Sequence, residues 1–133
     1  MLCVVADIPG IIENAHLNRG LGFSFLRHIE RCRCLLFVVD LSARDMDACQ
    51  QLHVLRHELE FYEAGLSHRP HVVIGNKTDL PGTEESADKL RTFVGDSASL
   101  LTISAKHRRN VDALSRIIRE MYDKHVAKTA EAT

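Results

Sequence analysis

The sequence predicts an α/β fold, a doubly wound and mostly parallel sheet with helices on both faces. Four short apolar runs, each bounded by polar or turn residues, have the length and near-continuous apolarity of strands buried on both faces. Segments with helical spacing alternate with these runs, and this alternation implies right-handed crossovers between parallel strands. The runs are Leu2 to Ala6, Leu35 to Val39, His71 to Gly75 and Leu100 to Ile103.

Four helices are expected from apolar positions that recur at helical spacing. These positions are Phe25, Leu26 and Ile29 in the first helix, Leu52, Leu55, Leu59 and Tyr62 in the second, Leu90 and Val94 in a short third, and Val111, Leu114, Ile117, Ile118, Met121 and Tyr122 in the last. Asn110 directly precedes the last helix and is its expected N-cap. We expect one domain over residues 1–126 and a disordered tail over residues 127–133.

Composition excludes several classes of protein. A hydrophobic content of 45% with 26% charged residues is that of one soluble globular domain. A formal net charge of -1 supplies no field that attracts nucleic acid or a membrane, so such a partner requires a local patch. No apolar run approaches the roughly 20 residues that span a bilayer, and no export signal is evident, so we expect no membrane partner. The four cysteines suit reduced intracellular thiols better than disulfides.

A polar residue follows each of the four predicted strands. These residues are Asp7, Asp40, Asn76 and Ser104. In an open parallel sheet, ligands bind beyond the carboxyl ends of the strands, where the loops converge and helix N-termini point their donors. We therefore expect a binding site along this one edge of the sheet.

The third of these loops has the residues needed to read guanine. Asn76, Lys77, Thr78 and Asp79 resemble the Asn-Lys-x-Asp element of the GTPase superfamily. An ionised Asp79 can accept hydrogen bonds from guanine N1–H and from the exocyclic amine, a pair of donors that adenine lacks. Lys77 can lay its methylene stem on the face of the base, and Asn76 can tie the loop to neighbouring backbone.

The fourth loop, Ser104-Ala105-Lys106, resembles the last nucleotide-contacting element of the same superfamily. The resemblance implies that the backbone N–H of Ala105 meets guanine O6 and that Ser104 supports Asp79. Lys106 completes the predicted set of nucleotide-binding residues at this end of the chain.

The first loop, Asp7-Ile8-Pro9-Gly10, resembles the Asp-x-x-Gly element that opens switch II. The resemblance implies that Asp7 holds Mg²⁺ through water and that the N–H of Gly10 meets the γ-phosphate of GTP. A glycine suits this position because a side chain would obstruct the approach of the phosphate to the backbone.

The stretch after Gly10 narrows the resemblance to the Obg family, whose members are ribosome-assembly GTPases. It comprises the segments from Ile11 to His16, from Arg19 to Gly22 and from Phe25 to Cys32, and the likeness continues to about Tyr122. The chain is more similar to the mitochondrial ribosome-associated members than to the bacterial ones. The resemblance implies GTP/GDP and Mg²⁺ as cofactors, the large ribosomal subunit or its rRNA as partner, and a mitochondrial location, with the cytoplasm as the alternative.

Two departures from the family pattern limit what this chain is expected to do alone. Ile11 stands where Ras-like GTPases have a water-orienting Gln, so no catalytic residue is assigned and slow hydrolysis is expected. The 133 residues also contain no Gly-x-x-x-x-Gly-Lys-Ser/Thr loop, nor the first strand and switch I. We expect weak or no GTP binding, no activity of the chain alone, and unpaired sheet edges open to self-association or complementation.

Several residues have a second interpretation that the sequence leaves open. His53 and His57 could chelate a metal, but a solvated helix face explains them better, and Cys32 and Cys34 lack the second pair that a zinc site needs. Asp40 either supports the site or caps the turn that follows its strand. Lys77 and Asp79 either read the base or form a surface ion pair. Four arginines are either an rRNA-binding patch or ordinary solvated side chains, namely Arg19, Arg27, Arg31 and Arg33.

Two other functions stay open at this stage. One is a non-catalytic G-domain remnant that acts as a protein or RNA interaction module. The other is an unrelated doubly wound domain that binds adenine.

Overall fold

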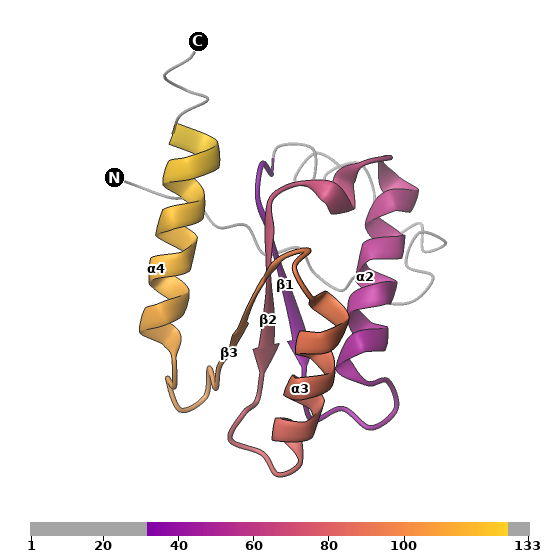
Figure 1. Cartoon of the computed structure of the whole chain (residues 1–133), viewed down its shortest axis with the longest axis vertical. Coiled ribbons are helices and arrows are strands. Elements are labelled where there is room, and N and C mark those ends of the chain that lie inside the picture. Colours follow the sequence, from indigo (N-terminus) through magenta and orange to yellow (C-terminus); the bar gives the residue numbers. More distant parts are fainter. Residues whose placement is uncertain (1–31, 128–133) are drawn as a thin grey trace.

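The computed structural model describes residues 32–127, which form a three-stranded parallel sheet with helices on both faces (Figure 1). The strands β1 (Leu35–Asp40), β2 (His71–Asn76) and β3 (Ser99–Thr102) lie in the order β1-β2-β3. This arrangement confirms the predicted α/β class. The predicted strand Leu2 to Ala6 and the helix around Phe25 lie outside the described residues, as does the tail from residue 128.

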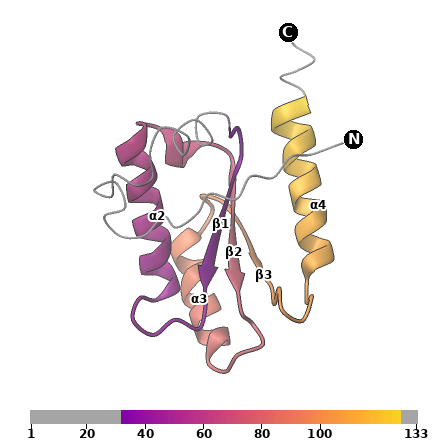
Figure 2. The same cartoon turned by 180° about the vertical axis from the view of Figure 1, so that it is seen from behind.

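Three helices connect and cover these strands. Helices α2 (Ala48–Tyr62) and α3 (Thr83–Val94) lie on one face of the sheet, and α4 (Val111–Tyr122) lies on the other (Figures 1 and 2). A short 3-10 helix, Leu66–His68, follows α2, and a π-helical turn, Asp123–Ala127, continues α4. All three helices coincide with segments that the apolar spacing predicts.

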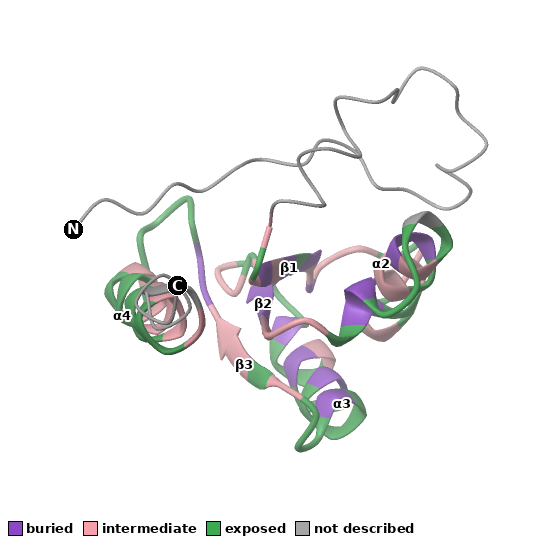
Figure 3. Cartoon of the chain, turned by 90° about the horizontal axis from the view of Figure 1, so that it is seen from above, coloured by how far each residue is buried: buried purple, intermediate pink, exposed green. Residues whose placement is uncertain are grey.

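Each face of the sheet has its own apolar cluster, and the two differ in burial (Figure 3). On the side of α2 and α3, residues such as Leu52, Val73 and Leu90 are completely buried. On the side of α4, the sheet contributes Val72, Ile74 and Ile103, but no residue of α4 itself is buried. Because successive side chains of a strand point to opposite faces, neighbouring residues of β2 such as Val73 and Ile74 belong to different clusters.

The strand register sets the position of the site. Asp40 pairs with Asn76, so β1 and β2 end level with each other, and Gly75 pairs with Thr102. The last strand spans residues 99–102, whereas the apolar run predicts residues 100–103. Ile103 lies beyond the strand, yet its N–H still donates to the carbonyl of Gly75 at 2.8 Å, so the loop leaves β3 alongside β2.

Asn110 precedes α4 as predicted, but it does not cap the helix with its side chain. Its backbone is left-handed, with φ 64°, and its side-chain Nδ2 donates to the carbonyl of Thr102 at 3.0 Å. The predicted N-cap position is therefore confirmed, but the amide group ties the loop back to β3 instead of accepting from the first turn of α4. A side-chain cap is present at α2, where Asp47 and Gln50 form a reciprocal capping box.

Candidate functional site

Three of the polar residues that follow the strands lie at the same edge of the sheet, at the lower end in Figure 1. Asp40 and Asn76 end neighbouring strands, and Ser104 lies two residues beyond β3. Parallel strands with level ends require this convergence. The fourth residue, Asp7, lies outside the described residues, as does Gly10.

Asn76 joins the loops that follow β2 and β3. Its Oδ1 accepts hydrogen bonds from the backbone N–H of Lys77 at 2.8 Å and from that of Ala105 at 3.1 Å. The N–H of Thr78 also donates to the carbonyl of Ile103 at 3.1 Å. The tie to neighbouring backbone expected of Asn76 is therefore present, and it brings the two motifs into contact across 29 positions of the chain.

Close packing beneath this loop requires Gly75. A Cβ at this position would lie 2.9 Å from Cδ2 of Leu41, a side chain that is itself buried. The N–H of Leu41 donates to the carbonyl of Asn76 at 3.1 Å, so the chain leaving β1 packs directly against the end of β2. The missing side chain of Gly75 thus allows the β1 and β2 loops to lie together.

Lys77 is extended toward Asp40, with Nζ 2.8 Å from Oδ2 of that carboxylate. The other carboxylate oxygen of Asp40 accepts from the N–H and the hydroxyl of Ser42, so Asp40 both stabilises its own turn and supports Lys77. Desolvation raises the pKa of Asp40, but the hydrogen bonds from Lys77 and Ser42 outweigh this effect and leave that pKa below its usual value. The alternative of a Lys77–Asp79 ion pair is not what the structure contains.

Asp79 is held by the second motif. The buried hydroxyl of Ser104 donates to Oδ1 of Asp79 at 2.8 Å, and Nε2 of His107 lies 3.5 Å from Oδ2. The hydrogen bond from Ser104 is the main cause of a lowered pKa of Asp79, opposed by desolvation and assisted by the positive charges of His107 and Lys106. Because its pKa is lowered, the carboxylate is ionised at neutral pH, and its contacts with Ser104 and His107 restrain its orientation.

The segment after Ser104 forms a tight turn. Ser104 and Arg109 exchange backbone hydrogen bonds of 3.2 and 3.0 Å, and the N–H of Arg108 donates to the carbonyl of Ala105. The N–H of Ala105, which the resemblance assigns to guanine O6, donates to Asn76 here. Within residues 32–127, the N–H of Lys106 has no hydrogen-bond acceptor.

His107 and Asp40 are the members of the site that motif reasoning did not place. His107 follows the Ser-Ala-Lys element and adds a second contact to Asp79, while its N–H donates to the Ser104 hydroxyl at 3.3 Å. Its position directly after the motif is a signal, but the sequence alone does not tell which way its ring points. For Asp40, the signal was its place at a strand end, which left its partner open.

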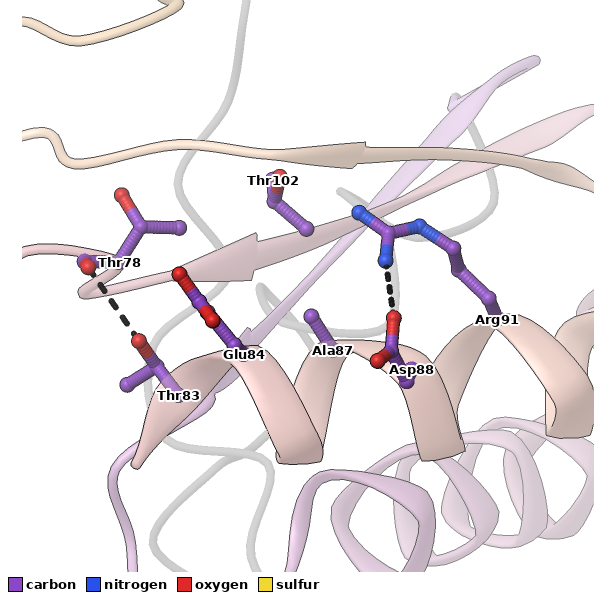
Figure 4. Close-up of a pocket in the computed structure, with 7 residues that line it drawn as sticks. All are labelled: Thr78, Thr83, Glu84, Ala87, Asp88, Arg91 and Thr102. Carbon is purple, nitrogen blue, oxygen red and sulfur yellow. Dashed lines mark hydrogen bonds and ion pairs between the residues drawn. The ribbon is translucent and has the colours of Figure 1, made fainter. Parts of the chain in front are cut away.

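A polar groove lies next to this site, between α3 and the strands β2 and β3 (Figure 4). Its walls carry an ion pair between Arg91 and Asp88 at 2.7 Å and a hydrogen bond from the Thr83 hydroxyl to the carbonyl of Thr78. The remaining lining residues are Glu84, Ala87 and Thr102. Thr78 of the Asn76–Asp79 loop lines the groove, whereas Asn76, Asp79 and Ala105 do not, so the groove adjoins the candidate base-binding loops on the side of α3.

The only predicted metal contact, through Asp7, lies outside the described residues. In the part of the chain that the structure describes, no group of three or more His, Cys, Asp or Glu side chains could hold a metal ion. The rings of His53 and His57 stack 6.5 Å apart on α2. No helix among residues 32–127 has the length and apolarity to cross a membrane.

The parallel sheet, its flanking helices and the loops at its carboxyl edge are those of part of a P-loop GTPase domain. Comparison with known proteins agrees. A family model described as 50S ribosome-binding GTPase matches residues 2–77, which is more than half of the chain. The chain belongs to this family of GTPases.

Individual relatives confirm the resemblance to the Obg group. The chain is 50% identical to Mitochondrial ribosome-associated GTPase 2 of Pongo abelii and, equally, of Homo sapiens, over 119 residues in each case. It is 46% identical over 116 residues to the GTPase Obg of Akkermansia muciniphila. These matches cover 86–90% of this chain, but the chain spans only 28–32% of the length of these relatives.

Proposed function

We propose that this chain carries the guanine-reading part of an Obg-type GTPase that couples GTP hydrolysis to large-subunit ribosome assembly. The observation that carries the proposal is the restrained carboxylate of Asp79, with Ser104 donating to one oxygen and His107 beside the other. A fixed anion at the edge of a parallel sheet has the chemistry to select guanine, because only guanine offers two adjacent donors from N1 and N2.

The neighbouring residues complete the recognition of the base. The stem of Lys77 stays half-exposed, with its amine anchored on Asp40, so its methylene groups are available to a base face. Guanine O6 would accept a hydrogen bond from the N–H of Lys106. It would also accept one from the N–H of Ala105 if that N–H no longer donates to Asn76. Ser104 acts through Asp79 and is a positioning residue.

The catalytic half of the proposal rests on the resemblance. Asp7 would assist Mg²⁺ through water, Gly10 would meet the γ-phosphate, and water would attack that phosphate while the metal neutralises charge. Ile11 offers no polar group to orient this water, so turnover is slow. The names of the relatives include ribosome association and mitochondria, which favour the large ribosomal subunit as partner and a mitochondrial location.

The substitution Asp79→Asn tests the base-reading role. The amide N–H of Asn would face the exocyclic amine of guanine, so two donors would meet. Xanthine has a carbonyl at that position, which can accept a hydrogen bond from the same amide N–H. We expect guanine nucleotide affinity to fall about 10-fold to 100-fold, since a charge-assisted hydrogen bond contributes about 1.5–3 kcal/mol. Xanthine nucleotide affinity should rise.

The measurement is titration with fluorescent guanine and xanthine nucleotides. It uses the chain extended upstream with a relative's G-domain segment that contains Gly-x-x-x-x-Gly-Lys-Ser/Thr. Asp88→Asn, an exposed carboxylate on α3, is the matched control and should change neither affinity. Unchanged guanine affinity in Asp79→Asn, or ATP competing as well as GTP, would contradict the proposal.

A further inference from the structure

The turn over residues 104–110 presents four consecutive basic side chains beside the candidate base site. Lys106, His107, Arg108 and Arg109 are all exposed. The turn connects β3 to α4 at the edge of the sheet where the strands end (Figures 1 and 2). Among the described residues this is the longest run of cationic positions, and it differs from the arginines near residues 19–33 to which sequence reasoning assigned RNA binding.

The cations of this turn lack acidic partners, unlike many others in the described part of the chain. Ion pairs within residues 32–127 engage Arg69, Lys77, Lys89, Arg91 and Arg119. No ion pair there involves Lys106, Arg108 or Arg109. Asp79, the acidic residue that contacts this turn, already faces Ser104 and His107. Three neighbouring charges are therefore available to an external anion.

The backbone of the turn holds these charges in place. Ser104 and Arg109 form an antiparallel bridge, and the side chain of Asn110 donates to the carbonyl of Thr102. Arg108 and Asn110 are left-handed at φ 56° and 64°, a conformation that a non-glycine residue keeps only when its surroundings enforce it. A preorganised turn loses less conformational entropy on binding than a flexible one.

The side chains of the turn fit phosphate groups better than bases or lipid tails. Guanidinium groups bind phosphate oxygens through two parallel hydrogen bonds. Residues 104–110 contain no Phe, Tyr or Trp to stack on bases, and their one aromatic ring, that of His107, lies against Asp79. Their only apolar side chain is that of Ala105, which offers nothing to insert into a bilayer. Charge without stacking or insertion is typical of contacts to a nucleic-acid backbone.

We propose that the turn over residues 104–110 is a contact surface for the phosphate backbone of RNA. The inference rests on the proposed function, in which the partner is a ribosomal subunit. Because Ser104 and Ala105 of this turn also hold Asp79 and Asn76, RNA bound at the turn restrains the guanine-reading loops. RNA and guanine nucleotide therefore each raise the affinity for the other by the same factor.

The test is fluorescence anisotropy of the 133-residue chain with a labelled 20-base-pair RNA duplex over a series of KCl concentrations. The triple variant Lys106→Gln, Arg108→Gln, Arg109→Gln should bind at least 10-fold more weakly at low salt. The negative slope of its log affinity against log salt should become less steep by about 2–3, because each phosphate that is no longer neutralised reduces the magnitude of the slope by about 0.9. The matched triple variant Arg44→Gln, Arg116→Gln, Lys124→Gln removes the same charge elsewhere and should change the slope by less than about 1.

Two further variants separate folding and base reading from RNA binding. Arg108→Lys with Arg109→Lys keeps the charge and should retain the wild-type salt slope, which a misfolded turn would not. In the upstream-extended chain, without nucleotide, Asp79→Asn should still bind RNA although its guanine affinity is lost. Failure of the guanine proposal therefore does not affect the RNA result, and failure of the RNA proposal does not affect the guanine result. Equal losses in the two triple variants, or no binding by the wild-type chain, would overturn the inference. So would tighter binding to phosphatidylserine vesicles than to RNA.

Discussion

Lys77 is a residue whose backbone conformation favours glycine. Its φ of 75° is left-handed, which costs a non-glycine residue about 1–2 kcal/mol. The side chain recovers little of this through the fold, since a half-exposed pair such as Lys77–Asp40 contributes at most about 1 kcal/mol. A residue that is locally unfavourable and yet anchored over a binding loop indicates a role outside stability.

The substitution Lys77→Gly should separate these contributions. Glycine relieves the strain of the left-handed backbone. This gain is offset because the ion pair with Asp40 is lost and because glycine has more conformational freedom in the unfolded chain. The free energy of unfolding should therefore stay within about 1 kcal/mol of wild type. Guanine affinity should fall, because the variant lacks the methylene stem that we propose covers the base. Urea unfolding and nucleotide titration measure the two effects, and a variant that keeps guanine affinity would remove Lys77 from the site.

At the scale of single elements, Glu60 organises the end of α2. Its carboxylate accepts from the hydroxyl of Ser67 at 2.5 Å, from the N–H of Ser67 at 3.0 Å and from the N–H of Gly65 at 2.8 Å. The Ser67 hydroxyl is the main cause that lowers the pKa of Glu60 to about 2. The ionised carboxylate thus holds the connection from α2 to β2.

Glu60→Gln should lower the melting temperature in a pH-dependent way. A carboxyl whose pKa is lower in the folded state stabilises the fold above its unfolded pKa, here 4.5, and that stabilisation is lost as the pH falls through about 2. The variant should therefore melt below wild type at pH 7 and converge with it near pH 2. Thermal unfolding across this range measures the difference, with the more exposed Glu63→Gln as control. A gap independent of pH would mean that the carboxylate charge is not responsible.

Neighbouring residues of β1 should differ in their response to the same change. Val39 is 1% exposed and faces α2 and α3, whereas Val38 is 54% exposed on the other face. We expect Val39→Ala to cost about 2 kcal/mol or more, because less apolar surface is buried and a cavity remains. Val38→Ala should cost less than about 0.5 kcal/mol. Equal destabilisation in urea unfolding would show that the face of β1 has been assigned the wrong way round.

Over the whole molecule, the two sides of the sheet differ in how firmly they are packed. Helix α2 places Leu52 and Leu59, at 0% and 2% exposure, in the larger apolar cluster. Helix α4 is strongly amphipathic but contributes only partly buried side chains, among them Leu114, Ile117 and Met121. Local opening needs least free energy where it uncovers little buried apolar surface.

Hydrogen exchange should therefore be faster in α4 than in α2. Amides of α4 are expected to exchange through opening of that helix alone, while amides of α2 exchange near the global unfolding limit. Leu114→Ala should accelerate exchange in α4 and leave α2 nearly unchanged. Equal protection of the two helices would mean that α4 unfolds only with the rest of the chain.

Local patterns predicted much of this structure. Apolar runs and helical spacing placed β1, β2, α2, α3 and α4, because strand and helix periodicity depends on residues that are near in sequence. The end of β3 was displaced by one residue, since Ile103 continues the hydrogen bonding to Gly75 outside the ladder. Asn110 takes the predicted N-cap position of α4, but its side chain donates to the carbonyl of Thr102, a partner that no local pattern predicts.

By itself, the sequence determined the fold class, through its apolar runs and helical spacing, and the family, through the resemblance of its motifs, and it singled out the residues that we propose to read guanine. Tertiary structure alone decided how those residues pair. Lys77 meets Asp40 from 37 positions away, Ala105 donates to Asn76, and His107 turns onto Asp79. Such partners depend on strand register and loop packing, which bring distant residues within hydrogen-bonding distance and which no local pattern encodes.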